Sequence, residues 1–116
     1  MQRISEEASF RERTGRTALT VAVFKAVWCK DCHFIEPFMP DVEKAYAGKV
    51  EFIEIDRDEL PDLCAELNIL GIPSFIAFQS GRELIRFVSK LRKSREEIEQ
   101  FLDRALAVSE ELRTRA

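Results

Sequence analysis

The sequence predicts an α/β domain whose elements follow the order β-α-β, α, β-β-α after a weak N-terminal helix. Three observations lead to this fold class. Residues 17–26 are apolar on both faces and rich in β-branched side chains, which is typical of a strand buried inside a parallel sheet. Apolar residues recur at helical spacing along 35–46 and again along 98–106. Only the short stretch S-G-R, residues 80–82, separates two further apolar runs, as in a hairpin.

The helix after the first strand contains two prolines. Pro37 and Pro40 lie inside its apolar pattern, so the helix is expected to bend or break there, and Gly48 ends it. The second strand is expected over 50–56, and the connection between the two strands should be a right-handed crossover. A short helix then follows over 60–67, where apolar residues recur at i, i+3, i+4 and i+7.

The second half of the chain predicts two strands and a long helix. The strands are expected over 74–79 and 84–88, joined by the short hairpin. Ser94 and Glu97 form the pattern of a capping box, which marks the start of the last helix. The apolar stripe of that helix is the clearest periodic signal in the sequence.

One domain is expected to fill the chain, because 116 residues suffice for one hydrophobic core but not for two. Its core should span about 17–107, with a short N-terminal helix within 1–16 and a fraying tail over 108–116. An apolar share of 46% and a charged share of 34% are typical of a soluble globular protein.

Charge and hydropathy argue against nucleic-acid and membrane partners. The formal charge is −3, from 18 basic and 21 acidic residues, and no basic domain emerges. One local excess, K-L-R-K-S-R over 90–95, is interpreted as the solvated entrance of the last helix. The N-terminus lacks the apolar run of a signal peptide, and no window approaches a membrane span. We therefore expect a cytoplasmic protein whose thiols are held reduced.

The stretch V-W-C-K-D-C-H, residues 27–33, carries the chemistry of the chain. Cys29 and Cys32 are three residues apart and His33 follows at once, a spacing that fits haem attachment, half of a metal site, or a redox dithiol. Covalent haem would need an apolar pocket where the core of the sheet is expected, which disfavours it.

Zinc within one chain is disfavoured as well, because it commonly needs four ligands. The only other cysteine, Cys64, lies on the apolar face of its helix and is expected to be a buried small hydrophobe. The single histidine, His33, is expected on the helix surface. A metal or cluster bridging two chains through Cys29 and Cys32 remains an open alternative.

The redox interpretation has a direct physical basis. A strand that ends just before Cys29 places it at the N-terminus of the next helix, where unpaired N–H groups and the helix dipole favour a thiolate. Lys30 adds positive charge beside it, and Asp31 partly cancels that charge. Cys32 follows on the same helix face, close enough to form a disulfide. One thiol can then attack while the other waits behind it.

The segments around this pair resemble the thioredoxin family. V-F-K-A-V-W-C-K-D-C-H-F-I-E-P, residues 23–37, is similar to the family's strand, Trp-Cys-x-x-Cys motif and kinked helix. N-I-L-G-I-P-S, residues 68–74, resembles the segment with the family's cis-proline, and F-Q-S-G-R-E, residues 78–83, the hairpin that follows. The resemblance runs over about 19–106 and is closest to small cytoplasmic thioredoxin-like proteins of Gram-positive bacteria.

This resemblance implies a fold and an activity. The fold would be the thioredoxin fold, a central mixed sheet of four or five strands flanked by helices on both faces. The activity would be that of a thiol–disulfide oxidoreductase, mainly a protein-disulfide reductase in cell redox homeostasis. Cys29 would attack, Cys32 would resolve, and Trp28 would shield the dithiol. Ile72 and Pro73 would lie against it, with the backbone of Ile72 pairing with an extended substrate segment.

The resemblance also implies partners. Substrates would be protein or low-molecular-weight disulfides, electrons would come from a reductase or a small thiol, and the protein would be a monomer. No cofactor is expected beyond the redox-active Cys29–Cys32 disulfide, and no resident metal.

Three departures from the family pattern matter for the chemistry. Val23 stands where thioredoxins carry a buried aspartate, Lys25 replaces a common tryptophan, and Ser89 replaces a glycine that lines the substrate groove. The loss of the aspartate motivates an alternative from another class. In it the chain is a non-catalytic thioredoxin-fold module that binds a partner and carries a redox-sensitive dithiol.

Overall fold

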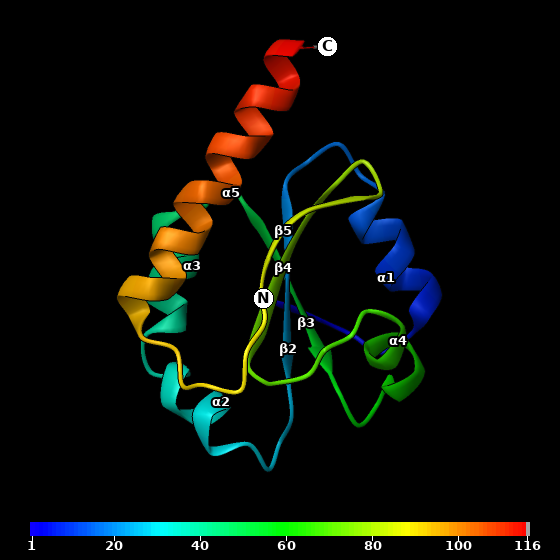
Figure 1. The fold of residues 1–116 in the computed structure, drawn as a ribbon, viewed down its shortest axis with the longest axis vertical. Helices are drawn as coiled ribbons and strands as arrows, with labels where there is room; N and C mark the ends of the chain where they lie inside the picture. The colour runs from blue at the N-terminus through cyan, green and yellow to red at the C-terminus, as the bar shows by residue number, and fades with distance from the viewer. Residues whose placement is uncertain (116) are drawn as a thin grey trace.

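Five strands form one mixed sheet in the computed structural model, which describes residues 1–115 (Figure 1). The strands lie in the order β1-β3-β2-β4-β5, with β2 at the centre. β1, β3 and β2 run parallel, and β4 and β5 run antiparallel to β2 and to each other. Their bounds are β1 Gln2–Ile4, β2 Thr20–Lys25, β3 Glu51–Asp56, β4 Ser74–Gln79 and β5 Arg82–Phe87.

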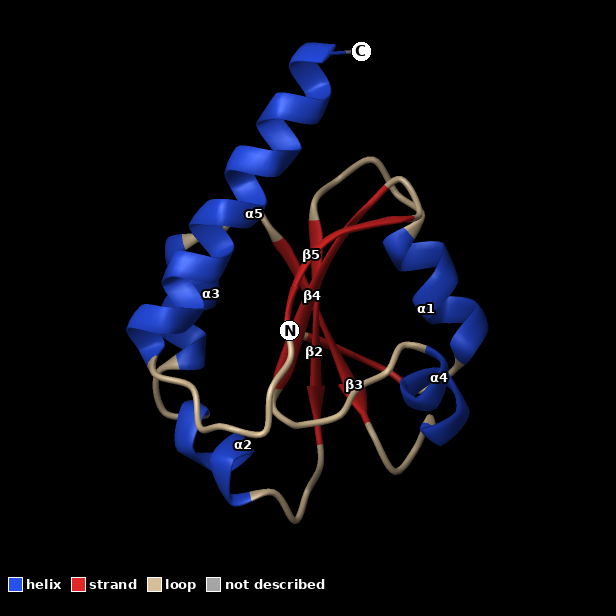
Figure 2. Ribbon diagram, viewed as in Figure 1, coloured by secondary structure: helices blue, strands red, loops and turns tan. Residues whose placement is uncertain are grey.

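Helices cover both faces of this sheet, which confirms the expected architecture (Figure 2). One face is covered by α1 (Glu7–Thr14) and α4 (Pro61–Glu66), the other by α3 (Met39–Ala45) and α5 (Arg95–Arg115). The short helix α2 (Lys30–Ile35) follows β2 directly and lies on the side of α3.

The two-sided burial expected of the first strand is confirmed in β2. Ala22 and Phe24 belong to the apolar cluster under α1 and α4, whereas Val21 and Val23 belong to the cluster under α3 and α5. All four are fully buried. Because alternate side chains of a strand point to opposite faces, β2 is held between both cores and its carboxyl end is fixed in place.

The predicted helix interruption and the predicted capping box are also confirmed. The helix after β2 is interrupted between α2 and α3, where Pro37 lies, and Pro40 stands in the first turn of α3. At the start of α5, the backbone N–H of Glu97 donates to the Ser94 hydroxyl at 3.2 Å. In return the N–H of Ser94 donates to the Glu97 carboxylate at 3.0 Å, which completes the capping box.

The hairpin is tighter than predicted. The last strand is expected at 84–88 after a three-residue turn, but β5 begins at Arg82, which pairs with Gln79. The turn is therefore Ser80 and Gly81 alone, and both have positive φ. A two-residue turn of this kind brings the strands into register at once, so pairing starts two residues earlier than the apolar pattern indicated.

Both ends of the chain hold more regular structure than the sequence predicted. The segment 1–16 was expected to contain only a short helix, but β1 precedes α1 and pairs with β3. The tail over 108–116 was expected to fray, but residues 108–115 continue α5 as far as Arg115, and residue 116 lies outside the described residues. Ser109 explains part of this length, because its hydroxyl donates to the Gln79 side chain at 2.8 Å and is buried there.

The attachment of α1 gives a stability prediction. Phe10 is buried against the rings of Phe24 and Phe78, with ring centres 6.5 and 5.5 Å away. Phe10→Ala is expected to lower the free energy of unfolding by about 3 kcal/mol, because it empties a packed site. The exposed Ser9→Ala on the same helix is the control, with a change below about 0.5 kcal/mol. A loss under about 1 kcal/mol for Phe10→Ala in urea denaturation would show that α1 does not pack as described.

Candidate active site at the start of α2

Cys29 occupies the N-cap position of α2, as the sequence predicted. The chain leaves β2 at Lys25, turns through three residues, and reaches Cys29 with an extended backbone conformation. The backbone N–H of Cys32 donates to Cys29 Sγ at 3.2 Å. The sulfur therefore serves as the capping acceptor of the helix and receives a donor that stabilises negative charge.

Cys32 lies one turn further along and deeper in the molecule. It is 0% exposed, whereas Cys29 is 6% exposed, so only Cys29 presents surface to an incoming disulfide. Burial, followed by the hydrogen bond with Cys29, raises the pKa of the Cys32 thiol well above its ordinary value. The backbone N–H of Ala26 and the positive charge of Lys25 act in the opposite direction on that pKa. Cys32 is thus less accessible than Cys29 and is harder to deprotonate than an ordinary thiol.

The segment before β4 closes the other side of the pair. Cys29 Sγ donates to the backbone carbonyl of Ile72 at 3.7 Å, which brings together residues far apart in the sequence. The peptide bond between Ile72 and Pro73 is cis, and both residues are buried. Ser74 donates through its hydroxyl to the carbonyl of Gly71. The predicted neighbours of the dithiol, Ile72 and Pro73, are therefore next to Cys29.

The other predicted site residues, Trp28, Lys30 and Asp31, lie beside the dithiol and differ in exposure and in contacts. Trp28 is 61% exposed, and its indole N–H donates to Asp58 at 2.7 Å, so the ring points toward the β3–α4 connection. Lys30 is exposed and makes no ion pair within residues 1–115. Asp31 is half-buried and accepts a hydrogen bond from Arg92 at 2.9 Å. The charge of Asp31 is thus partly compensated by a residue from another segment.

The position of the family's buried aspartate is apolar here. Val23 is fully buried in an apolar cluster with Ile35 and Val42. Lys25 follows two residues later and so shares that face of β2, where it pairs with Glu54 at 3.1 Å. The charges beside this position are therefore those of an ion pair, formed by Lys25 and by Glu54, which is the register partner of Val23 on β3. Lys25 lowers the pKa of Cys32.

Sequence reasoning missed the loop between β5 and α5. The basic stretch 90–95 was interpreted as a solvated helix entrance, but Lys93 is only 1% exposed. Its neighbour Arg92 reaches Asp31 between the two cysteines, and its guanidinium lies 4.4 Å from the centre of the Phe34 ring. No sequence signal distinguished a buried lysine from its exposed neighbours, because only the packing of the loop decides which is enclosed.

Two predictions about cysteine and histidine are confirmed. Cys64 is buried in the apolar cluster under α4, and burial raises its pKa. His33 is exposed on α2, where its ring nitrogens contact the Glu36 carboxylate at 3.1 Å and the Val27 carbonyl at 2.6 Å. Across residues 1–115, no three side chains of His, Cys, Asp or Glu gather in a way that could hold a metal ion.

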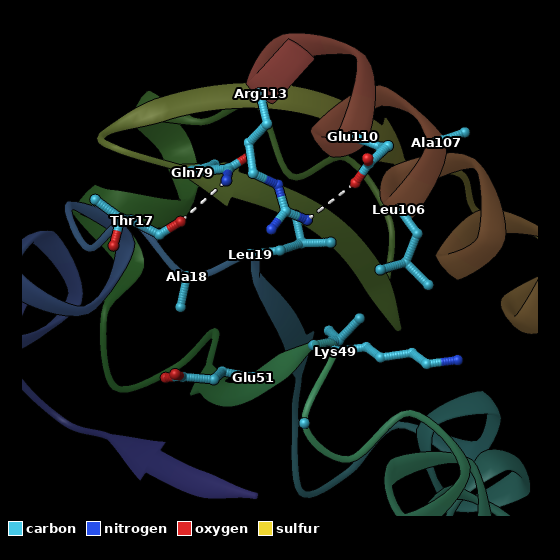
Figure 3. A pocket seen from close by; sticks show the side chains of 12 residues that line it. Thr17, Ala18, Leu19, Lys49, Glu51, Gln79, Leu106, Ala107, Glu110 and Arg113 are labelled. Carbon is cyan, nitrogen blue, oxygen red and sulfur yellow. Dashed lines mark hydrogen bonds and ion pairs between the residues drawn. The ribbon is translucent and has the colours of Figure 1, made fainter. Parts of the chain in front are cut away.

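A separate hollow lies at the other end of the sheet. A cavity of about 600 Å³ opens between the C-terminal half of α5 and the turn before β3 (Figure 3). Its lining contains neither cysteine nor histidine and includes an ion pair between Glu110 and Arg113 at 3.6 Å. The cavity is thus separate from the dithiol, which lies at the carboxyl end of β2.

Comparisons with known proteins agree with this geometry. The sequence profile of the Thioredoxin family matches residues 2–104. The chain belongs to the thioredoxin family. Thioredoxin from Synechocystis sp. is 30% identical over 89 residues, which cover 76% of this chain and 83% of that protein. Thioredoxin H2 of Arabidopsis thaliana is 34% identical over 79 residues, 68% of this chain but only 59% of that longer protein.

Solved thioredoxin structures share the fold. The thioredoxin of Malassezia sympodialis superposes with a TM-score of 0.80 at 27% identity, covering 90% of this chain and 92% of that one. Plasmodium falciparum thioredoxin also reaches 0.80, at 24% identity, with 90% and 98% coverage. The sheet order and the helices on both faces are therefore those of the thioredoxin fold.

The difference between the two thiols gives a testable prediction. A thiol whose pKa is raised stays protonated at neutral pH, and only the thiolate reacts with iodoacetamide. In the reduced protein at pH 7, alkylation should therefore reach Cys29 and leave Cys32 and Cys64 unmodified, as peptide mass spectrometry would show. Modification of all three sites in 6 M urea is the control. Equal labelling of Cys29 and Cys32 in the folded protein would contradict the described burial.

Proposed function

We propose that this thioredoxin-family member is a thiol–disulfide oxidoreductase that acts mainly as a protein-disulfide reductase through Cys29 and Cys32. The observation that carries the proposal is the asymmetry of the pair. Cys29 has the exposed surface, a backbone donor on its sulfur and the Ile72 carbonyl beside it, whereas Cys32 is enclosed behind it. This arrangement suits one attacking and one resolving thiol.

The reaction consists of two exchanges. The Cys29 thiolate attacks one sulfur of a substrate disulfide, forms a mixed disulfide, and releases the other substrate sulfur as a thiolate that takes a proton from water. Cys32 then loses its proton and attacks Cys29 Sγ. This forms the Cys29–Cys32 disulfide and releases the second substrate thiol. The substrate gains two electrons and two protons, and a reductase or a small thiol returns the pair to the dithiol form.

The deprotonation of Cys32 is the demanding step, because burial raises its pKa. The charge of Lys25 and the N–H of Ala26 favour the thiolate of Cys32. Val23 supplies no carboxylate that could accept the proton. We propose that Lys30 and Asp31 tune the same equilibrium from the loop between the cysteines. Ile72 and Pro73 would hold the substrate backbone, and Trp28 would cover the exposed side.

An apolar surface around the dithiol favours protein substrates. Apart from Met1, every large apolar side chain among residues 1–115 that is strongly exposed lies in a segment flanking the pair. Exposed apolar residues gathered at one place mark an interaction surface. They are Val27, Trp28, Phe34, Leu70 and Leu91.

A second candidate function is favoured by the apolar environment of Val23. Without a buried carboxylate, resolution by Cys32 could be too slow for turnover, and the chain would be a module that binds a partner in the groove beside Pro73. Binding that persists after a double Cys29→Ser, Cys32→Ser change, together with negligible turnover of the native protein, would support this candidate over the reductase.

The setting of the activity is proposed from composition and from the relatives. We propose a cytoplasmic monomer that needs no cofactor beyond its own dithiol. Some relatives are chloroplastic, such as thioredoxin X of Arabidopsis thaliana, of which the matched region covers 43%. No helix within residues 1–115 has the length and apolar character needed to cross a membrane. Cell fractionation would test the compartment, and gel filtration the monomer.

Single cysteine substitutions test the reductase. Cys29→Ser is expected to abolish the reduction of insulin by dithiothreitol above the uncatalysed rate, because the attacking sulfur is gone. Cys32→Ser should instead accumulate a mixed disulfide between Cys29 and the substrate, visible by mass spectrometry. Cys64→Ser is the matched control and should retain at least about half of the activity, because Cys64 is buried under α4 and presents almost no surface to a substrate. Full activity in Cys29→Ser would end the proposal.

A further inference from the structure

The loop between β5 and α5 touches both segments that hold Cys29. We call residues Ser89–Lys93 the rim loop. The Ser89 carbonyl lies so close to Gly71 that an added Cβ there would be 2.1 Å away, so the absence of a side chain lets the loop approach beside Ile72. At its other end, Arg92 donates to Asp31 at 2.9 Å.

A buried ammonium group fixes the shape of the rim loop. Lys93 Nζ donates to the carbonyls of Ser89 at 3.1 Å and Leu91 at 3.0 Å, and it lies 5.2 Å from the centre of the Phe87 ring. No carboxylate within residues 1–115 forms an ion pair with it. Burial of a charge is costly, so its donors must be satisfied by these carbonyls. The loop is consequently preorganised and does not adapt freely to a partner.

The charges on the two sides of the dithiol differ in sign. On the rim-loop side, Lys90 is exposed and makes no ion pair within residues 1–115. Arg92 is 56% exposed and is paired with Asp31, the one carboxylate described at this side. Lys30 adds a third positive charge from α2. The opposite side, where Trp28 contacts Asp58, is the β3–α4 connection. Its carboxylates are Asp56, Asp58, Glu59 and Asp62. The cations beside them are Arg57 and Arg3, which pairs with Asp56 and Glu59, so the carboxylates remain in excess.

We propose that the rim loop selects disulfide partners by the position of their acidic residues. The preferred partner is a protein segment that carries carboxylates on one side of its own disulfide-bonded cysteine. In the bound segment, that side faces Lys90 and Arg92. This proposal rests on the reductase function and specifies its substrate class. Opposite charges at a contact accelerate association and fix orientation. A partner bound in the opposite orientation would place its carboxylates beside those of the β3–α4 connection, which would repel them.

Two peptides of identical composition isolate this effect. Each carries one cysteine and two glutamates, placed directly before the cysteine in one peptide and directly after it in the other, and each is supplied as its symmetric disulfide. The second-order rate constant for oxidation of the reduced protein is followed by the fluorescence of Trp28, the only tryptophan of the chain. We expect the two rate constants to differ by at least about threefold at low ionic strength and to converge in 0.5 M salt.

Two charge reversals identify the source of the difference. Lys90→Glu should abolish or invert the ratio of the two rate constants. The matched control Lys49→Glu lies at the far end of the sheet, beside the large cavity (Figure 3), and should keep the ratio. A ratio between isomers is insensitive to any uniform change in thiol reactivity, so it reports partner selection.

The outcomes separate the two proposals. Equal rate constants for the two peptides, or a ratio that survives Lys90→Glu, would overturn the selection by charge while leaving the reductase intact. Failure to reduce either peptide would overturn the reductase function and the selection with it.

Discussion

The hydrogen bond from the Cys32 backbone to Cys29 Sγ is the interaction on which the site depends. It exists because β2 ends at Lys25 and α2 starts five residues later, so the sulfur takes the place of a capping oxygen. The same geometry puts Cys32 one turn further on and out of reach of solvent. A single local feature therefore sets which thiol is presented and which is enclosed.

That local feature is held by the burial of β2 on both faces. Its side chains alternate between two apolar clusters, one under α1 and α4 and the other under α3 and α5. A strand fixed from both sides cannot shift its end without disturbing both cores. The precision of the dithiol thus comes from apolar packing at the centre of the sheet.

The sequence predicted the parts of this arrangement that local chemistry controls. The burial of β2 on both faces, the break at Pro37 and the capping box at Ser94 and Glu97 each follow from properties of a few neighbouring residues. β1 was missed because three residues of strand carry almost no periodicity and are stabilised by pairing with β3. The burial of Lys93 was missed for a similar reason, since it depends on carbonyls and a ring that only the folded loop brings together.

The apolar surroundings of Val23 change how the family's chemistry can operate. With no carboxylate on that face of β2, the charges beside Val23 are those of Lys25 and of its ion-pair partner Glu54 on β3. A positive charge stabilises a thiolate but accepts no proton, so the proton of Cys32 must leave by another route. This difference concerns the resolving step alone, because Cys29 keeps its backbone donor and its contact with Ile72.

The reduction potential of the Cys29–Cys32 pair tests the central claim most directly. Because burial opposes a thiolate at Cys32, the reduced form is not stabilised at both sulfurs, which favours oxidation of the pair and hence reduction of substrates. Equilibration with dithiothreitol buffers should give a reduction potential of about −270 mV, typical of thioredoxins. A reduction potential of about −120 mV would indicate an oxidant whose dithiol form is strongly stabilised, and it would contradict the account.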